Sequence, residues 1–453
     1  MHTISKMATS KSIPKKEKQA RTDGRLVELE ATGLTAAGEG VARLDGLVVF
    51  VHGLLPGEKA LVRIKESGKR FGRAELEKLR LPSAQRTRIG CAGHGLCGGC
   101  PWSHLNYEAQ LQWKRQIVAD TLQRIGKLNP GLVRPVIGMA DPRGYRNKLR
   151  VRTSCRGGRW TLGLLEARTQ KVVPVEECLL VNSRINILMS SVRRGLQELS
   201  AGAVVPESLT FRAGTATGQL MVSAEPGWGS AGSAVKTALR SRHPGWRIGF
   251  IEADTLLLNP PGVEEDFVEI VRGFRFRVGP HSFFQVNTVQ AGTLVDLVRE
   301  YLGRDKISHV FDIYCGVGLF SIAVAGTAGA VTGVEGDERA VTLARENAVL
   351  NGIFNARFVS SRAEDYLTSD EALNAGVEAV IVDPPRSGLS PRVREALIDL
   401  KPRQMVYVSC DPATLARDLG DFSRSGYTVT CVQPVDMFPH TGHVECVASL
   451  HKA

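Results

Sequence analysis

The sequence predicts an α/β fold in which a C-terminal, class I Rossmann-like domain follows a small OB-like β-barrel and a β-rich central domain. From about residue 290, strand and helix patterns alternate as they do in a doubly wound parallel sheet. A glycine-rich loop, Cys315-Gly-Val-Gly, joins a buried strand pattern to a helix pattern. Near the N-terminus, short apolar runs alternate with glycine-rich turns, which is typical of a small barrel.

The 453 residues are too many for a single core, so several segments are expected. These are a basic disordered tail (1–21), the barrel (22–80), a cysteine connector with the central domain (81–290) and the Rossmann-like domain (291–453). No apolar run reaches the roughly 18 residues of a membrane span, and the N-terminus has no apolar secretion core. We therefore expect a cytoplasmic protein, and nothing in the sequence requires more than a monomer.

Charge is distributed unevenly along the chain, whose formal net charge is +12. Residues 1–90 carry 18 Lys/Arg against 10 Asp/Glu, and residues 91–300 carry 26 against 17. Residues 301–453 reverse the balance, with 14 against 19. A front that binds a polyanion, joined to a separate chemical domain, accounts for this pattern better than solubility alone.

The barrel segment combines strand patterns with a basic surface. Lys65, Lys69, Arg70 and Arg73 surround Phe71, a mixture of charge and stacking surface that single-stranded nucleic acid prefers. The expected strands are Leu26-Val-Glu-Leu, Leu47-Val-Val-Phe-Val and Lys59-Ala-Leu-Val-Arg-Ile, and the expected turns are Gly38-Glu-Gly-Val and Pro56-Gly.

Three of the nine cysteines, an odd number that argues against a disulfide framework, crowd into ten residues of the connector. Cys91, Cys97 and Cys100 supply three soft ligands, and Cys155 or Cys178 could supply a fourth. Zinc sites usually pair two short Cys-x-x-Cys units. This three-plus-one arrangement favours a [4Fe–4S] cluster instead, with zinc and unligated thiols as the alternatives.

The central and C-terminal regions differ in texture. Residues 130–280 read as β-rich and include an alternating basic strand from Tyr145 to Arg152. In the C-terminal region, strands are predicted near 309–313, 331–335, 357–359, 379–382, 404–409, 427–432 and 445–450.

The glycine loop indicates which cofactor the Rossmann-like domain takes. Gly316-x-Gly318 is followed by Ser321, so the third glycine of the dinucleotide pattern is absent. Glu335, 23 residues after Asp312, ends the next strand and can accept both ribose hydroxyls. A ribose without a pyrophosphate points to S-adenosylmethionine, with a generic dinucleotide binder as the alternative.

Two further motifs indicate the chemistry. Asp383-Pro-Pro is followed by Arg386 rather than by the aromatic residue that amine methylation often uses to stack a base. Cys410, at a strand end before Asp411, can act as a nucleophile. A thiolate that adds to carbon 6 of a uracil turns carbon 5 into a methyl acceptor, and the lone acid Glu445 can remove the carbon-5 proton. The nucleophile must be a thiolate, which neighbouring Asp411 would oppose.

The chain resembles the RNA 5-methyluridine (uracil-5-) methyltransferases, which use S-adenosylmethionine. The resemblance covers nearly the whole chain and rests on five ordered motifs. They are His281-Ser-Phe-Phe-Gln-Val-Asn, Asp312-Ile-Tyr-Cys-Gly-Val-Gly, Asp383-Pro-Pro-Arg-Ser-Gly-Leu, Val408-Ser-Cys-Asp-Pro-Ala-Thr-Leu-Ala-Arg-Asp and Asp436-Met-Phe-Pro-His-Thr-Gly-His-Val-Glu.

The resemblance implies a role for each matching residue. Cys410 would be the nucleophile and Glu445 the proton acceptor, and the 22–80 segment would be a TRAM domain that binds RNA. Some members of the family carry a [4Fe–4S] cluster, and their spacing matches Cys91, Cys97, Cys100 and, as the distant ligand, Cys178. The matching S-adenosylmethionine contacts are Gln285, Tyr314, Glu335 and Asp383.

The substrate is expected to be a uridine of RNA, flipped into a cleft beside Cys410. Ribosomal RNA, most specifically 23S, is favoured because TRAM plus cluster goes with that branch of the family. The alternatives are transfer RNA, cytosine-5 methylation (which would want a second catalytic cysteine near Asp383) and a non-catalytic RNA-binding iron–sulfur protein. Cys155, Cys315, Cys431 and Cys446 are predicted to be buried packing residues.

Overall fold

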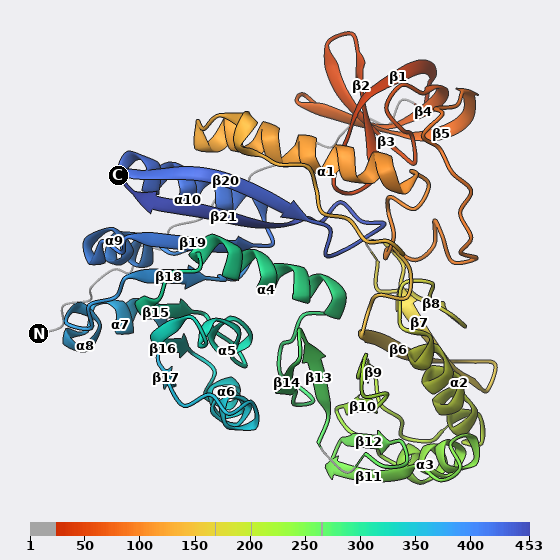
Figure 1. Ribbon diagram of the computed structural model, residues 1–453. Helices are drawn as coiled ribbons and strands as arrows, with labels where there is room; N and C mark the ends of the chain where they lie inside the picture. Colours follow the sequence, from red (N-terminus) through yellow and green to blue (C-terminus); the bar gives the residue numbers. More distant parts are fainter. Residues whose placement is uncertain (1–23, 168, 201, 264–265) are drawn as a thin grey trace, which may run out of the picture. The chain divides into compact units, whose positions relative to one another are not determined.

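The structure is a computed structural model that describes residues 24–453 except 168, 201 and 264–265 (Figure 1). The predicted tail, residues 1–21, lies outside the described residues. The chain divides into two compact units, one ending at Arg86 and one running from Thr87 to Ala453. This division separates the barrel unit from everything after it and does not divide the second unit further. The predicted segment boundaries therefore stay predictions.

The first unit is a closed five-stranded barrel with the order β1-β2-β3-β5-β4, which confirms the OB-like prediction. Its pairs are antiparallel except β3 with β5. Alternate residues such as Val49 and Val51 point into the barrel and are buried. The strands are β1 (Leu26–Leu34), β2 (Glu39–Leu44), β3 (Leu47–His52), β4 (Lys59–Ser67) and β5 (Phe71–Leu81).

The predicted turn at Gly38-Glu-Gly-Val is wrong for most of its length, because β2 begins at Glu39. Gly40 serves close packing there. A Cβ at Gly40 would lie 2.6 Å from the carbonyl oxygen of Leu54, which no side chain tolerates.

The central part of the second unit is a seven-stranded antiparallel sheet with the order β11-β12-β10-β9-β6-β7-β8. Two helices pack against it, α2 (Ser183–Gln197) and α3 (Ala231–Arg242), and their apolar residues share its core. The predicted basic strand starts three residues later than expected, at Lys148. The strands are β6 (Lys148–Arg156), β7 (Arg159–Leu165), β8 (Val172–Pro174), β9 (Ser208–Ala213), β10 (Leu220–Glu225), β11 (Arg247–Glu252) and β12 (Thr255–Asn259).

The C-terminal sheet has the order β17-β16-β15-β18-β19-β21-β20 (Figure 1). The five strands from β17 to β19 are parallel, and β21 runs antiparallel to both β19 and β20. Strands lie at all seven predicted places. They are β15 (Ile307–Ile313), β16 (Ala328–Glu335), β17 (Ala356–Ser360), β18 (Ala379–Val382), β19 (Gln404–Ser409), β20 (Tyr427–Val435) and β21 (Glu445–Lys452).

Helices cover both faces of this sheet, as a doubly wound fold requires, and two separate apolar cores result. One core includes α4, α5 and α6; the other includes α1, α7, α9 and α10. A β13 (Val268–Val271)–β14 (Phe274–Arg277) hairpin precedes α4, and the short helices η1 (Leu122–Gly126) and η2 (Pro130–Leu132) follow α1. The helices are α1 (Tyr107–Thr121), α4 (Thr288–Leu302), α5 (Leu319–Val324), α6 (Glu338–Leu350), α7 (Ala363–Leu367), α8 (Asp370–Leu373), α9 (Pro391–Leu400) and α10 (Pro412–Arg424).

Within the described part of the chain, every helix is too short or too polar to span a membrane.

Candidate active site

Three of the predicted cofactor residues follow parallel strands of the C-terminal sheet. Tyr314 follows β15, Glu335 ends β16 and Asp383 follows β18. Parallel neighbours end at the same edge of a sheet, so all three lie along that edge. Backbone hydrogen bonds tie them to the neighbouring strands: the Tyr314 N–H donates to the Val334 oxygen at 2.8 Å, and the Asp383 N–H donates to the Ile313 oxygen at 3.3 Å.

Two carboxylates brace the glycine loop. Glu335 accepts hydrogen bonds from the N–H groups of Gly316 (3.1 Å) and Asp337 (2.9 Å). Asp312 is fully buried and accepts from both the N–H (2.8 Å) and the hydroxyl (2.5 Å) of Ser321. Ser321 stands where the dinucleotide pattern has its third glycine, and its hydroxyl instead fixes the first turn of α5 to β15. The loop is therefore held in place before any ligand binds.

Cys410 and Glu445 face each other at the end of one antiparallel ladder. The last paired residues of β19 and β21 are Ser409 and Cys446. The next residue on each side is Cys410 and Glu445, respectively. Glu445 is also paired with Val435 of β20 and is only 3% exposed, whereas Cys410 is partly exposed. The sheet thus brings together two residues that are 35 positions apart in the sequence.

Asp411 does not act on the thiol as the sequence suggested. Its carboxylate caps α10 by accepting from the N–H groups of Ala413 and Thr414, both at 2.9 Å. A carboxylate at a helix N-terminus is neutralised in part by the helix dipole. The pKa of Cys410 is raised instead by burial and by two other carboxylates.

Burial, then the charges of Glu445 and Asp383, raise the pKa of the Cys410 thiol to about 11, and the Arg386 guanidinium opposes them. Burial, then Asp383, raise the pKa of Glu445 to about 8, again against Arg386. Burial and the nearby Asp312 raise the pKa of Asp383 to about 7. Without ligands, burial and the neighbouring carboxylates therefore favour the neutral forms of Cys410 and Glu445.

The segment Asp436–His443, here the Asp436 loop, leads directly into Glu445 and is held from α1. Lys114 and Asp436 form an ion pair at 2.5 Å in which both side chains are fully buried. Gln110 accepts a hydrogen bond from the His440 N–H at 2.8 Å. These contacts fix the entry to β21, and with it the position of Glu445.

The two histidines of the Asp436 loop have different surroundings. The His440 ring nitrogen Nδ1 lies 3.3 Å from the Gln110 amide nitrogen, a structural hydrogen bond. His443 is exposed and packs edge-on against Phe438, with ring centroids 6.0 Å apart. His440, by contrast, is half-buried.

Gln285 precedes α4 and is only 7% exposed. Its backbone oxygen accepts a hydrogen bond from the Asn147 side chain at 3.0 Å. Two residues further on, the Asn287 side chain donates to the backbone oxygen of Met437, in the Asp436 loop, at 3.1 Å. Gln285 is therefore joined to the Glu445 side of the site through the backbone that follows it.

The four predicted metal ligands, Cys91, Cys97, Cys100 and Cys178, line one cavity. Burial raises the pKa of Cys97, and it raises that of Cys100 to about 12; the other thiols of the set add to both shifts, which places them near one another. Among the described residues, no three of these sulfurs lie within 4.8 Å of one another. The set is gathered but wider than a single zinc ion needs, since tetrahedral Zn–S bonds of about 2.3 Å imply sulfurs about 3.8 Å apart.

Of the predicted packing cysteines, Cys315, Cys431 and Cys446 are buried, as expected. The prediction for Cys155 is wrong, because it is exposed on β6. Cys155 is opposite Trp160, one pair before the β6–β7 turn.

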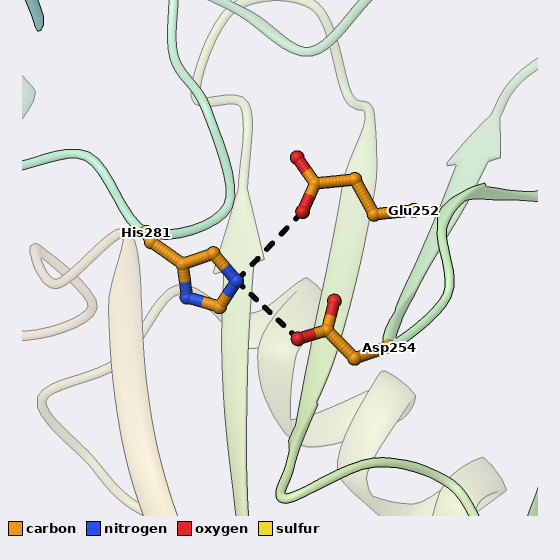
Figure 2. Close-up of side chains that lie close together, drawn as sticks. All are labelled: Glu252, Asp254 and His281. Carbon is orange, nitrogen blue, oxygen red and sulfur yellow. Dashed lines mark ion pairs between the residues drawn. The ribbon is translucent and has the colours of Figure 1, made fainter. Parts of the chain in front are cut away.

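Outside this site, three possible metal ligands come together at the surface (Figure 2). His281 Nε2 lies 3.3 Å from Asp254 and 3.8 Å from Glu252. The side chains of His281 and Glu252 are 43% and 51% exposed, and exposed acidic groups are common without an ion. We interpret the group as an ion-pair contact between the central sheet and the Gln285 segment.

On the barrel, Phe71 is 39% exposed and its ring centroid lies 5.7 Å from that of Phe50. The Arg73 guanidinium lies 5.9 Å from the Phe50 centroid and 5.8 Å from the Phe71 centroid. Arg73 also pairs with Glu39, and Lys65 pairs with Glu75. The predicted aromatic and basic surface is present, but part of its charge is neutralised within the barrel.

Comparison with known families agrees with the geometry. Residues 106–453 match the model of the tRNA (uracil-5-)-methyltransferase family, and residues 20–76 match that of the TRAM domain. The chain belongs to the tRNA (uracil-5-)-methyltransferase family. It is an RNA methyltransferase with a TRAM barrel and a C-terminal methyltransferase fold.

Similar proteins match over nearly their whole length. The chain is 34% identical over 451 residues to an uncharacterised RNA methyltransferase of Caldanaerobacter subterraneus subsp. tengcongensis, covering 95% of this chain and 98% of the relative. It is 35% identical over 452 residues to one of Thermosynechococcus vestitus, covering 94% and 98%. The solved structure of Pyrococcus abyssi tRNA (uracil-54, C5)-methyltransferase with S-adenosyl-L-homocysteine is 27% identical, has a TM-score of 0.71 and covers 93% of this chain and 99% of its own.

Several residues that shape this uracil-5-methyltransferase site were not singled out from the sequence. Lys114 was not among the predicted residues, yet it is fully buried against Asp436. Asn147 lay inside the predicted basic strand, yet it is 4% exposed and contacts Gln285. The signals available were weak: a lysine in the interior of a helix pattern and an asparagine among cations give no pairing partner.

Proposed function

We propose that this chain transfers a methyl group from S-adenosylmethionine to carbon 5 of a uridine in 23S ribosomal RNA. In this proposal Cys410 forms a covalent bond to carbon 6 and Glu445 removes the carbon-5 proton. The supporting observation is that Cys410 and Glu445 each lie one residue beyond the last pair of the β19–β21 ladder, where both are influenced by Asp383 and Arg386.

The residues perform the reaction as follows. The Cys410 thiolate adds to carbon 6, and the electrons of the C5=C6 bond move toward carbon 5 and the carbonyl. Carbon 5 then accepts the methyl group. Glu445, as the carboxylate, takes the proton from carbon 5, the C5=C6 bond reforms, and the Cys410 thiolate leaves. Arg386 favours the charged forms of both groups, which the reaction needs.

The edge of the C-terminal sheet fits S-adenosylmethionine. Glu335 offers two carboxylate oxygens beside the glycine loop, which suits a ribose with two hydroxyls. Tyr314 and Asp383 lie along the same edge, and we expect Gln285 to complete the set. When bound, the cofactor supplies an electrophilic methyl group.

We further propose that Cys91, Cys97, Cys100 and Cys178 hold a [4Fe–4S] cluster. The donor set supports it, since four thiolates are the usual ligands of such a cluster. The four cysteines line one cavity, and the thiols of the set raise one another's pKa, so they are gathered at a single place. Its role in this proposal is structural, because the connector that carries three of the cysteines also contacts the Asp436 loop through the Trp102 N–H and the His440 oxygen at 3.1 Å.

Ribosomal RNA is proposed over transfer RNA on the resemblance alone, which implies that a TRAM domain together with a cluster goes with the ribosomal branch of the family. The Pyrococcus relative acts on uracil-54 of tRNA, which makes transfer RNA the second candidate. The two are separated by incubating the enzyme with methyl-labelled S-adenosylmethionine and either RNA, and then mapping the labelled nucleotide. Label in tRNA alone would exclude the ribosomal assignment.

The mechanism is tested on the same reaction. Wild-type enzyme should produce 5-methyluridine, and Cys410→Ala should reduce the rate by at least about a thousandfold, because removal of a covalent nucleophile removes the easier route. Cys155→Ala is the matched control, an exposed cysteine outside the site. Labelled 5-methylcytidine, or full activity in Cys410→Ala, would contradict the proposal.

The role of Glu445 predicts a trapped adduct. Glu445→Gln keeps the shape of the side chain but removes the base, so methylated RNA should stay bonded to Cys410. A slower-migrating protein–RNA species should persist in denaturing electrophoresis, and Cys410→Ala in the same chain should abolish it. A Glu445→Gln variant that releases methylated RNA at the wild-type rate would exclude this residue as the base.

The cluster is tested by anaerobic purification with iron, sulfide and zinc analysis. About four iron and four sulfide per chain, with absorption in the visible region, are expected. Cys178→Ala should lower the iron content, whereas Cys155→Ala should leave it unchanged. A colourless protein with one zinc per chain would overturn the assignment.

A further inference from the structure

The segment His281–Asn287, here the strap, joins the β13–β14 hairpin to α4 and is gripped along its length by the central sheet. At its start, His281 pairs with Asp254 and Glu252 of the β11–β12 hairpin region (Figure 2). One residue on, the Arg212 guanidinium of β9 donates to the Ser282 oxygen. The strap is the part of the chain that carries Gln285.

Asn147 makes the central contact of the strap. Its side-chain nitrogen donates to the Gln285 oxygen at 3.0 Å, and its backbone N–H donates to the Val286 oxygen at 2.8 Å. The Asn147 backbone oxygen accepts a hydrogen bond from the Ala213 N–H of β9 at 3.0 Å. Asn147 is 4% exposed, so water does not compete for these bonds. The backbone carbonyls of Gln285 and Val286 are thus both held by Asn147 of the central domain.

A buried network in turn orients the Asn147 side chain. The same nitrogen lies 3.2 Å from Glu269 Oε1 and 3.0 Å from Thr288 Oγ1. Glu269 is 2% exposed and also accepts from the Thr215 N–H at 3.3 Å. The network favours one orientation of the Asn147 amide, with its nitrogen toward the strap, because an oxygen there would face the Gln285 carbonyl oxygen, which has no proton to donate.

The far end of the strap reaches the catalytic side of the site. Asn287 is fully buried; its nitrogen donates to the Met437 oxygen at 3.1 Å, and its oxygen caps α4. Its backbone also forms a bridge with Arg146, the neighbour of Asn147. Residues 146 and 147 therefore contact both the Gln285 peptide and the residue that touches the Asp436 loop.

We propose that Asn147, a residue of the central domain, is a positioning residue for methyl-donor binding, acting through the backbone of Gln285. This rests on the proposed function, in which Gln285 contacts S-adenosylmethionine. Asn147 itself touches no substrate. It holds the strap carbonyls so that the Gln285 side chain starts from one fixed backbone, and the central sheet thereby sets the affinity of a site in the C-terminal domain.

The test uses full-length protein and S-adenosylhomocysteine as the probe, with affinity measured by calorimetry and unfolding measured separately by thermal melting. Asn147→Asp replaces the donor with an acceptor and should weaken binding about tenfold or more, because it repels the Gln285 oxygen and Glu269. Glu269→Gln keeps an acceptor and should change affinity by less than about threefold. Asn259→Ala, another buried asparagine of the central sheet, is the control that lowers Tm without weakening binding.

The double variant Asn147→Asp/Glu269→Gln separates positioning from stability. A glutamine at 269 can donate to an aspartate at 147, so Tm should recover toward the wild-type value. The Gln285 oxygen still lacks its donor, so affinity should stay at least about tenfold weaker. In turnover, KM for S-adenosylmethionine should rise while kcat changes by less than about threefold. Recovery of affinity together with Tm would overturn the proposal, since Asn147 would then act on stability alone.

Gln285→Ala distinguishes failure of the inference from failure of the proposed function. If Gln285→Ala weakens binding and Asn147→Asp does not, the positioning role is wrong and the cofactor assignment stands. If Gln285→Ala binds as tightly as the wild type, the cofactor assignment of Gln285 is wrong, and the positioning role falls with it.

Discussion

Arg386 lies beside both groups whose charge the proposed reaction needs. Its guanidinium lowers the pKa of Cys410 and of Glu445, although burial raises each by more. The sequence suggested Arg386 only as an argument against amine methylation. In the folded chain it is the cation that offsets the carboxylates around the thiol.

A pH dependence follows from these shifts. Because the pKa of Glu445 is raised to about 8, the residue is protonated at lower pH and accepts no proton from carbon 5. The single-turnover rate should therefore rise as the pH passes about 8, and go on rising toward about 11, where the Cys410 thiol ionises. Arg386→Met removes a nearby cation, raises the pKa of both groups further, and should move the midpoint about one unit to higher pH.

The control for this profile is Arg392→Met, an exposed cation on α9. It should leave the midpoint at its wild-type position, because Arg392 is not among the groups that shift the pKa of Cys410 or Glu445. An Arg386→Met profile that overlays the wild-type curve would show that Arg386 does not tune the site.

For individual residues, the sequence predicted which side chains form the site better than it predicted which groups shift their pKa. Cys410 was recognisable because an apolar strand ends at it, and Glu445 because of the motif before it. The environment of the thiol was not predictable, since it depends on Asp383 and Arg386. These two residues come near Cys410 because β18, which they follow, is the neighbour of β19 in the sheet. Asp411 was expected to act on the thiol, but helix capping directs its carboxylate to Ala413 and Thr414.

Among the elements, α1 is the one that fixes the Asp436 loop. Lys114 donates to Asp436 at 2.5 Å and to the Phe438 oxygen at 3.0 Å, and its burial lowers its pKa. The pair contributes to the position of Glu445 as well as to stability. Asp436 lies within ten residues of Glu445, and Lys114 lies on the helix that holds the Asp436 loop.

Lys114→Met should therefore destabilise the second unit and slow catalysis. It leaves the Asp436 carboxylate buried without a cation, which costs about 3–5 kcal/mol. Urea unfolding and the single-turnover rate measure the two effects. Arg124→Met, at an exposed position of η1, should change stability by less than about 0.5 kcal/mol. Equal stability of the Lys114→Met and Arg124→Met variants would argue against any structural weight for the pair.

The elements themselves were predictable to different degrees. All seven C-terminal strands were predicted, because a buried parallel strand reads as a short apolar run between helix patterns. The helix α2 was not, although Ile185, Leu188 and Val192 repeat at helical spacing and are buried. The many short apolar runs around it outweighed that signal. The turn expected at Gly38 is mostly strand, and Gly40 there packs against the Leu54 backbone, a contact that a local reading of glycine as a turn residue does not reveal.

For the whole molecule, the excess of basic residues lies in a different part of the chain from the candidate catalytic residues. The basic excess belongs to residues 1–300 and the acidic excess to residues 301–453, while Cys410 and Glu445 belong to the acidic part. Binding energy from the phosphate backbone is therefore expected to come from outside the catalytic domain, and to fall with salt.

The barrel allows stacking and charge to be separated by experiment. Phe71→Ala should weaken RNA binding about tenfold at every salt concentration, because it removes a stacking surface. Arg70→Ala should instead reduce the slope of log affinity against log salt by about 1. Fluorescence anisotropy over a salt series with a labelled RNA measures both. A Phe71→Ala variant with wild-type affinity would exclude base stacking at this surface.

The ladder between β19 and β21 has a further consequence for how the site moves. Glu445 is still paired with Val435 of β20, whereas Cys410 lies one residue past the last rung, at Ser409–Cys446. The base is thus anchored on one side while the nucleophile sits in a turn. Fraying of this last rung would widen the gap between them without unfolding the rest of the sheet. Amide hydrogen exchange at Cys446 should therefore report on catalytic competence, and a covalently trapped RNA should slow it.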